Sequence, residues 1–137
     1  MIMRTRRIVF ATLALICVQL QACKRSGAAL TNADLPGLYV CNLPGSLQTV
    51  ELRKDATFVQ TIADGSEHTT YYGHWGLERS GFQVMLLPYH FEWPSYLGPP
   101  SVGAWVATAK YSGDGRMLLA VSEDDGLYCI RGNEGRG

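Results

Sequence analysis

The sequence lacks the patterns by which most enzymes are recognised. It contains no G-x-S-x-G, H-E-x-x-H or P-loop segment, and it has only three histidines. Its 12 basic residues are matched by 12 acidic ones, and loss of residues 1–22 with their three arginines would leave 9 basic against 12 acidic residues, a balance without the electrostatic footprint of a nucleic-acid-binding protein. These absences predict a protein that is not an enzyme and that uses no metal, cofactor or nucleic acid.

No hydrophobic run is long enough to span a membrane as a helix. The longest, residues 8–20, has 13 residues, whereas a spanning helix needs about 20. It follows three arginines and is typical of an export signal. The next residues, Leu20-Gln21-Ala22-Cys23, resemble the bacterial lipobox, in which a small residue precedes a lipidated cysteine.

That resemblance implies a lipoprotein signal peptide at residues 1–22, a lipid on Cys23 and a tether at residues 23–34. Lys24 follows the cysteine where an aspartate would mark retention in the inner membrane, so the resemblance implies an outer-membrane anchor facing the periplasm. Two or more acyl chains would hold the protein stably. An ordinary secretory signal, cut after Ala29, is the alternative.

Cysteine is scarce. Cys17 lies in the expected signal peptide, and Cys23 would carry the lipid, so Cys41 and Cys129 remain for the domain. No second cysteine lies within C-x-x-C distance of either. Because the cell envelope is oxidising, we predict a disulfide between Cys41 and Cys129. A redox-active or metal-binding pair of thiols is the alternative.

Alternation of apolar and polar residues dominates residues 47–87. Four short runs with period two indicate half-buried strands, and turn-forming clusters at 54–56, 63–66 and 78–81 separate them. The residues expected on the inward faces are Val50 and Leu52; Phe58, Gln60 and Ile62; Tyr71, Gly73, Trp75 and Leu77; and Phe82, Val84 and Leu86.

Further strands are expected at residues 38–42, 102–111, 117–122 and 127–131, and no segment has a helical period. The prediction is an all-β protein, a single small antiparallel up-and-down barrel of about eight strands at residues 35–132, followed by a disordered tail at 133–137. Closure would bring Cys41 on the first strand beside Cys129 on the last. A two-sheet sandwich is the alternative.

Three segments resemble a known family. Gly37-Leu38-Tyr39, the run at residues 50–58 and Gly73-His74-Trp75 are similar to the G-x-Y, L-x-L-x-x-D-G-x-F and G-x-W segments of small lipocalin-like bacterial lipoproteins of the NlpE N-terminal-domain type. The resemblance implies the fold more than an activity. Ala56 replaces the usual turn glycine, which suggests a different turn geometry, and the family's C-x-x-C is missing, so its metal or redox role is not implied.

A second resemblance concerns inhibitors. Tyr39-Val40-Cys41, the late Cys129 and the lipid anchor are similar to features of bacterial lipoprotein inhibitors of c-type lysozyme, which are also small eight-stranded barrels. Their inhibitory Ser-Gly-x-x-Tyr segment has no convincing match in this chain. Inhibition of a lysozyme or another hydrolase is therefore the alternative function.

The best candidate for a binding site is the segment 88–101. It exceeds the usual loop length and concentrates the aromatic residues Tyr89, Phe91, Trp93 and Tyr96 between prolines. Such rings either contact a ligand or partner or fold over one barrel end as a plug. Trp75 is expected in the core, and it serves as a ligand platform only if it lines an open cavity.

Other ionisable residues give weaker signals. His74, His90 and Glu92 offer ligands suited to zinc or copper, but their spacing is unspecific, and residues 123–125 fit a solvated turn better than a calcium site. The predicted function is therefore a lipid-anchored envelope module that binds a small apolar ligand or a periplasmic partner protein. An enzyme, or a metal-binding or sensor protein, ranks third after the inhibitor.

Overall fold

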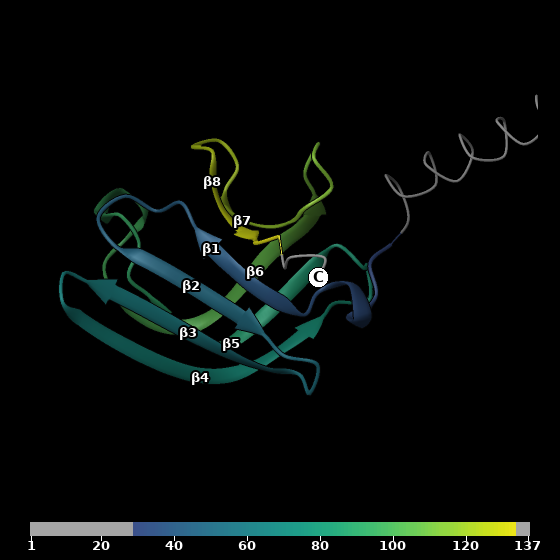
Figure 1. Cartoon of the computed structure of the whole chain (residues 1–137), viewed down its shortest axis with the longest axis horizontal. Helices are drawn as coiled ribbons and strands as arrows, with labels where there is room; N and C mark the ends of the chain where they lie inside the picture. The colour runs from purple at the N-terminus through teal and green to yellow at the C-terminus, as the bar shows by residue number, and fades with distance from the viewer. Residues whose placement is uncertain (1–28, 134–137) are drawn as a thin grey trace, which may run out of the picture.

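Eight antiparallel strands follow one another in chain order around a closed barrel (Figure 1). The computed structural model describes residues 29–133; the expected signal peptide, Cys23, the first half of the tether and nearly all of the tail lie outside them. The strands are β1 Gly37–Cys41, β2 Leu47–Leu52, β3 Thr57–Asp64, β4 Glu67–Leu77, β5 Gln83–Phe91, β6 Ser101–Tyr111, β7 Met117–Ser122 and β8 Leu127–Arg131. Two short 3-10 helices are η1 Asn32–Asp34 and η2 Ser95–Leu97.

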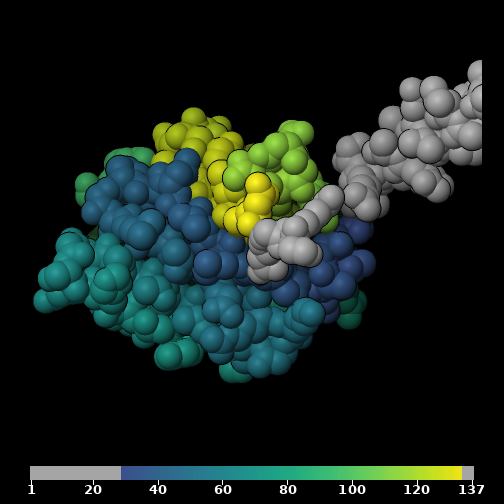
Figure 2. Space-filling view, viewed as in Figure 1, coloured from purple at the N-terminus to yellow at the C-terminus, as the bar shows by residue number. Residues whose placement is uncertain are grey.

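The seam of the barrel lies between β1 and β8. These strands pair antiparallel, and Cys41 lies opposite Cys129, to which it is joined by a disulfide. Figure 2 shows the blue β1–β2 region packed directly against the yellow C-terminal strand. The predicted barrel and the predicted cysteine pair are therefore confirmed, and closure rules out the two-sheet alternative. The disulfide closes a long loop, which on the chain-entropy view contributes about 4–5 kcal/mol.

Side chains from alternate positions of the strands fill the barrel interior. Tyr39, Val50, Phe58, Val84 and Leu86 are fully buried there, as the period-two pattern predicts. Two polar side chains, Gln48 and Gln60, are also fully buried. Phe82 differs from the prediction. It lies in the turn before β5 and is 49% exposed, because the strand begins one residue later and the ring is not held over the core.

β5 is longer than the sequence predicts. The segment 88–101 was expected to be a loop, but the strand continues to Phe91, and the connection to β6 covers only residues 92–100. Pro88 cannot donate to a strand ladder, yet it falls at an irregularity between Leu86 and Tyr89, where no ladder bond is needed. Beyond this point β5 pairs with β6 again, through Tyr89–Gly103 and Phe91–Ser101.

β5 crosses the inner face of β4 at Gly73. The ladder between the two strands ends at His74–Leu87. A Cβ atom on Gly73 would lie 2.5 Å from the ring of Phe58 and 2.8 Å from the carbonyl oxygen of Leu87. Because Gly73 has no side chain, the main chain of β5 can pass beneath β4 at this point.

Inside the barrel, the side chain of Gln60 takes over the pairing that β4 no longer supplies. Its Nε2 donates to the His90 carbonyl at 2.7 Å, and the His90 N–H donates to its Oε1 at 3.1 Å. The alternation predicts that Gln60 faces inward, and its hydrogen bonds with the His90 main chain explain why a polar residue is tolerated there.

Ala56 adopts the left-handed conformation in the β2–β3 turn, with φ at 65°. Glycine is favoured in this region because it lacks a Cβ atom. The resemblance suggested that replacing the turn glycine would change the turn geometry. The backbone at position 56 has a conformation suited to glycine, and the alanine is strained.

The chain enters and leaves the barrel at one end, which we call the tether end. Leu30 N–H donates to the Gly81 carbonyl, and Gly132 N–H donates to the Leu38 carbonyl, both at 3.0 Å. The segment that leads into β1 lies at the right in Figure 1. The opposite, distal end carries the connections 42–46, 65–66, 92–100 and 123–126. In residues 29–133, no helix has the length and hydrophobicity needed to cross a membrane.

Candidate functional site

Three of the predicted site residues come together at the distal end. The rings of Tyr89 and Phe91 are 5.1 Å apart, and those of Phe91 and Trp93 are 4.8 Å apart. Trp105 on β6 completes the group, 4.8 Å from Tyr89 and 5.6 Å from Trp93. These edge and tilted contacts are the arrangements that aromatic quadrupoles favour, so the four rings form one rigid cluster.

The outer side of this cluster lines a hollow. A pocket of about 300 Å³ is bordered by the rings of Phe91 and Trp93 together with Leu97, Pro99 and Ser101, and by Gly98. Tyr89 is fully buried, whereas Phe91 and Trp93 are half-buried. The rings of this segment therefore pack into the barrel end, as the plug alternative predicts, and two of them also border an open pocket; their contact with a ligand or partner stays a prediction. Tyr96 is 62% exposed and does not line this pocket.

Buried polar atoms lie among these residues. Gln48 Nε2 donates to the Glu92 carbonyl at 2.6 Å and so holds the start of the connection 92–100. Within residues 29–133, Gln48 Oε1, the Tyr89 hydroxyl and Trp93 Nε1 are buried without a hydrogen-bond partner. Burial raises the pKa of Tyr89 well above its ordinary value, so the hydroxyl is a neutral donor at neutral pH.

The sequence reasoning missed Gln48, although a signal existed. Gln48 has the same parity as Val50 and Leu52 on β2, so the alternation already places it inside the barrel. Unpartnered buried donors and acceptors are uncommon in folded proteins, and they can satisfy a polar atom of a bound group.

Trp75 lies near the other end of the barrel. Its ring is buried, and its indole N–H donates to the Arg53 carbonyl, in the β2–β3 turn, at 2.9 Å. The structure therefore places Trp75 in the core and does not bring it to the pocket beside Phe91 and Trp93.

The three histidines lie in different surroundings. His90 stacks on Tyr71 with ring centroids 3.5 Å apart, and His68 and His74 are exposed on β4. No group of three or more His, Cys, Asp or Glu side chains in the described part of the chain is placed to hold a metal ion. The acidic turn after β7 is exposed, and Glu123 forms an ion pair with Lys110 at 2.7 Å.

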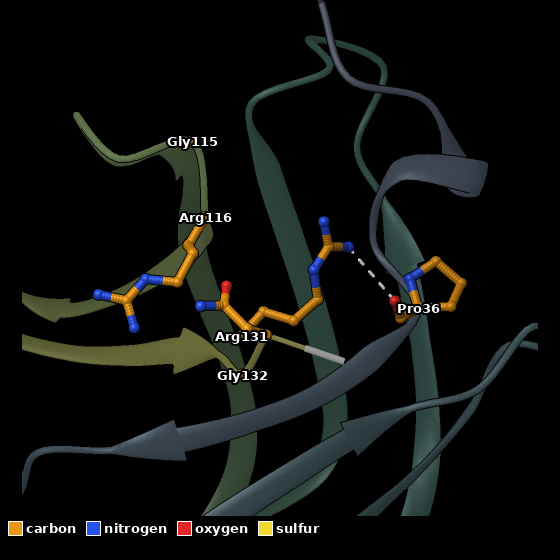
Figure 3. A pocket seen from close by; sticks show the side chains of 6 residues that line it. Pro36, Gly115, Arg116, Arg131 and Gly132 are labelled. Carbon is orange, nitrogen blue, oxygen red and sulfur yellow. Dashed lines mark hydrogen bonds between the residues drawn. The ribbon is translucent and has the colours of Figure 1, made fainter. Parts of the chain in front are cut away.

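A second hollow, of about 270 Å³, lies at the tether end between Pro36, Arg116 and Arg131 (Figure 3). Arg131 Nη1 donates to the carbonyls of Asp34 at 2.6 Å and Pro36 at 3.3 Å. Figure 3 shows the Arg116 side chain pointing away from that of Arg131, and its Nε donates to Asp114 at 2.7 Å. Both arginines are thus engaged by the protein, and Arg131 fastens the segment before β1 to the end of β8.

Comparison of this chain with protein-family models, with curated proteins and with solved structures found no match. Its function must therefore be argued from its own residues.

Proposed function

We propose that this chain is a lipid-anchored module of the bacterial outer membrane that faces the periplasm and binds without catalysing a reaction. The binding site is the pocket at the distal end, and its occupant is an apolar group of a small ligand or of a periplasmic partner protein. The anchor is the lipid on Cys23, which the lipobox resemblance implies.

The observation that carries this proposal is the pocket between Phe91, Trp93 and Leu97. Its lining is mostly apolar, and its volume of about 300 Å³ suits a single ring or a branched side chain. Burying a group of that size contributes about 1.5–3 kcal/mol. The rigid ring cluster behind the pocket also lowers the entropy cost of binding.

The position of the pocket favours an envelope role. The tether joins the barrel at the end near Gly81, whereas the pocket lies among the distal connections. A barrel anchored through residues 23–34 would therefore present the pocket away from the lipid surface, where periplasmic molecules can reach it.

Indole is a suitable probe because it has the size of one ring and carries one polar atom. In the full chain, we expect added indole to shift the NMR resonance of the Trp93 indole N–H and not that of Trp75, which already donates to Arg53. Leu97→Trp should fill the pocket and abolish the shift. Leu47→Trp, at an exposed position on β2 outside the pocket, should preserve it. Equal shifts for Trp75 and Trp93, or an unchanged response in Leu97→Trp, would remove the pocket from the proposal.

A further inference from the structure

Half of β4 has a strand on one side only. β4 pairs with β3 from Glu67 to His74, but its ladder with β5 runs only from His74 to Leu77. Residues 67–73 therefore have β3 as their one strand neighbour within residues 29–133. In Figure 1, β4 is the outermost strand along the lower margin of the molecule.

Whether a residue of β4 has an odd or an even number determines to which side its main-chain N–H and C=O groups point. Trp75 N–H donates to the Ala56 carbonyl, on the β3 side, at 2.9 Å. Main-chain groups alternate in direction along a strand, so odd-numbered residues of β4 face β3. The N–H and C=O groups of His68, Thr70 and Tyr72 consequently face the opposite side, where no strand pairs with them in the described residues.

β5 is prevented from closing this gap. It passes beneath Gly73, where the Leu87 carbonyl would meet a Cβ atom at 2.8 Å, and it then continues inside the barrel. There the main chain of His90 is bound by the side chain of Gln60. Because the His90 main chain of β5 is already hydrogen-bonded to the Gln60 side chain, β5 does not pair with residues 67–73 of β4. This edge of β4 therefore stays open.

The open edge has none of the features that usually protect one. Residues 68–72, His-Thr-Thr-Tyr-Tyr, contain no lysine, arginine or proline, and the register with β3 runs through them without a bulge. Threonine and tyrosine favour extended structure. Tyr72 is 69% exposed, the highest value among the large hydrophobic residues. Such an edge is a template for another strand.

Charge indicates what kind of strand fits. Asp64 and Glu67 close the β3–β4 hairpin beside this edge. The distal connections add the carboxylates of Glu92, Asp124 and Asp125, whereas Glu123 is already paired with Lys110. A basic segment is therefore attracted to this end of the barrel, and an acidic one is repelled.

A second copy of this chain fits less well. Parallel pairing of two β4 edges would place the two acidic hairpins side by side, and antiparallel pairing would point the tether ends in opposite directions. One membrane could not readily hold both anchors.

We propose that the β4 edge at residues 68–72 accepts an extended, basic segment of a partner protein as an additional strand. Main-chain hydrogen bonds from His68, Thr70 and Tyr72 supply the affinity, and the carboxylates of Asp64 and Glu67 beside the edge select the charge. This edge is separate from the pocket beside Phe91 and Trp93 and does not depend on it.

The test uses an octapeptide of alternating lysine and valine as the probe and an octapeptide of alternating glutamate and valine as its control. Amide hydrogen exchange of the full chain is followed residue by residue by NMR. Without peptide, the amides of His68, Thr70 and Tyr72 should exchange fast, whereas those of Thr69 and Tyr71, bonded to β3, should exchange slowly. The lysine peptide should slow the first three by about tenfold or more, and the glutamate peptide should not.

Two variants isolate the main-chain contribution. Thr70→Pro removes the central free N–H without removing a bond to β3, and it should weaken peptide binding by about tenfold. Thr70→Val keeps the N–H and should bind like wild type. If Thr70→Pro fails to fold, a lysine peptide N-methylated on its pairing amides gives the same information on wild type, and it should not bind.

Three results would overturn the proposal. Slow exchange of the His68, Thr70 and Tyr72 amides in the dilute chain without peptide would show that the edge is not free. Equal protection by the two peptides would remove the charge selection. Protection that grows with protein concentration in the absence of peptide would assign the edge to a second copy.

Discussion

Gln60 and His90 exchange two hydrogen bonds across the interior of the barrel, one in each direction between the amide side chain of β3 and the main chain of β5. Here the Gln60 side chain makes the two hydrogen bonds that the main chain of a neighbouring strand would otherwise make. The pair explains how β5 can leave β4 without abandoning its own polar groups.

Replacement of Gln60 should therefore be costly. Gln60→Met keeps the size of the side chain but leaves the His90 N–H and C=O unpaired, so we expect a loss of about 2–4 kcal/mol in the free energy of unfolding. Gln48→Met is the matched control. Gln48 is equally buried, but it makes one short bond to the main chain, at the Glu92 carbonyl, and a longer one to Ser46 Oγ at 3.3 Å, so its loss should be about half as large. Urea titration measures both, and equal losses would contradict the role assigned to Gln60.

Two glycines of β4 should respond oppositely to alanine. Gly73→Ala places a methyl group against Phe58 and Leu87 and should destabilise the chain by about 1–3 kcal/mol. At Gly76 a Cβ atom would meet nothing within 4 Å, so Gly76→Ala should be neutral or slightly stabilising. Thermal unfolding of the two variants makes the comparison, and a stable Gly73→Ala chain would mean that β5 does not cross there.

Ala56→Gly should stabilise the protein. The left-handed conformation costs an alanine about 1–2 kcal/mol, and the greater flexibility of unfolded glycine offsets part of that gain, which leaves roughly 0.5–1 kcal/mol. Ala63→Gly, within β3 where no left-handed residue occurs, should instead destabilise the chain. The midpoint of urea unfolding distinguishes the two directions.

The buried tyrosines Tyr39 and Tyr89 should make the fold sensitive to alkali. Burial raises the pKa of both hydroxyls above the ordinary value of about 10. The unfolded chain then loses these protons at a lower pH than the folded chain, so stability is retained below about pH 10 and falls above it. Each tyrosine should contribute a slope of about 1.4 kcal/mol per pH unit.

Tyr89→Phe tests that slope most cleanly, because the Tyr89 hydroxyl has no partner in residues 29–133, whereas the Tyr39 hydroxyl donates to the Leu35 carbonyl. The variant should lose about half of the dependence on pH above 10 and keep its stability at neutral pH. An unchanged slope would place the hydroxyl in contact with water.

The proposed anchor has a direct test. Cys23→Ser should move the protein from the membrane fraction of the cell envelope to the soluble periplasmic fraction, because the acyl chains would have no attachment site. Cys17→Ser, in the expected signal peptide, should leave the distribution unchanged. A Cys23→Ser protein that stays wholly with the membrane would refute the anchor.

The sequence could predict the number and order of the strands because alternation and turn clusters are local signals. Phe58, Gln60 and Ile62 on one face of β3 illustrate this. The disulfide between Cys41 and Cys129 could also be predicted. They are the two cysteines that remain for the domain, and closure of the barrel brings their strands side by side.

The course of β5 could not be predicted. Pro88 is a signal for the end of a strand, and nothing in residues 83–91 states that the main chain will cross beneath Gly73 and pair with a glutamine side chain. The open edge of β4 results from that crossing, so it could not be predicted from the sequence either. The aromatic segment was recognisable as a candidate site, but only three dimensions show that Tyr89 is packed inside while Phe91 and Trp93 border a pocket.

The hydrogen bonds of Arg131 to the Asp34 and Pro36 carbonyls hold the segment before β1 against the end of β8, so whatever is linked to either segment lies at the tether end. An affinity tag or a fused protein at the C-terminus would crowd the same side as an acyl chain at the N-terminus. Labels intended to leave binding undisturbed should be attached at the tether end. Probes intended to report on binding should be placed at the distal end.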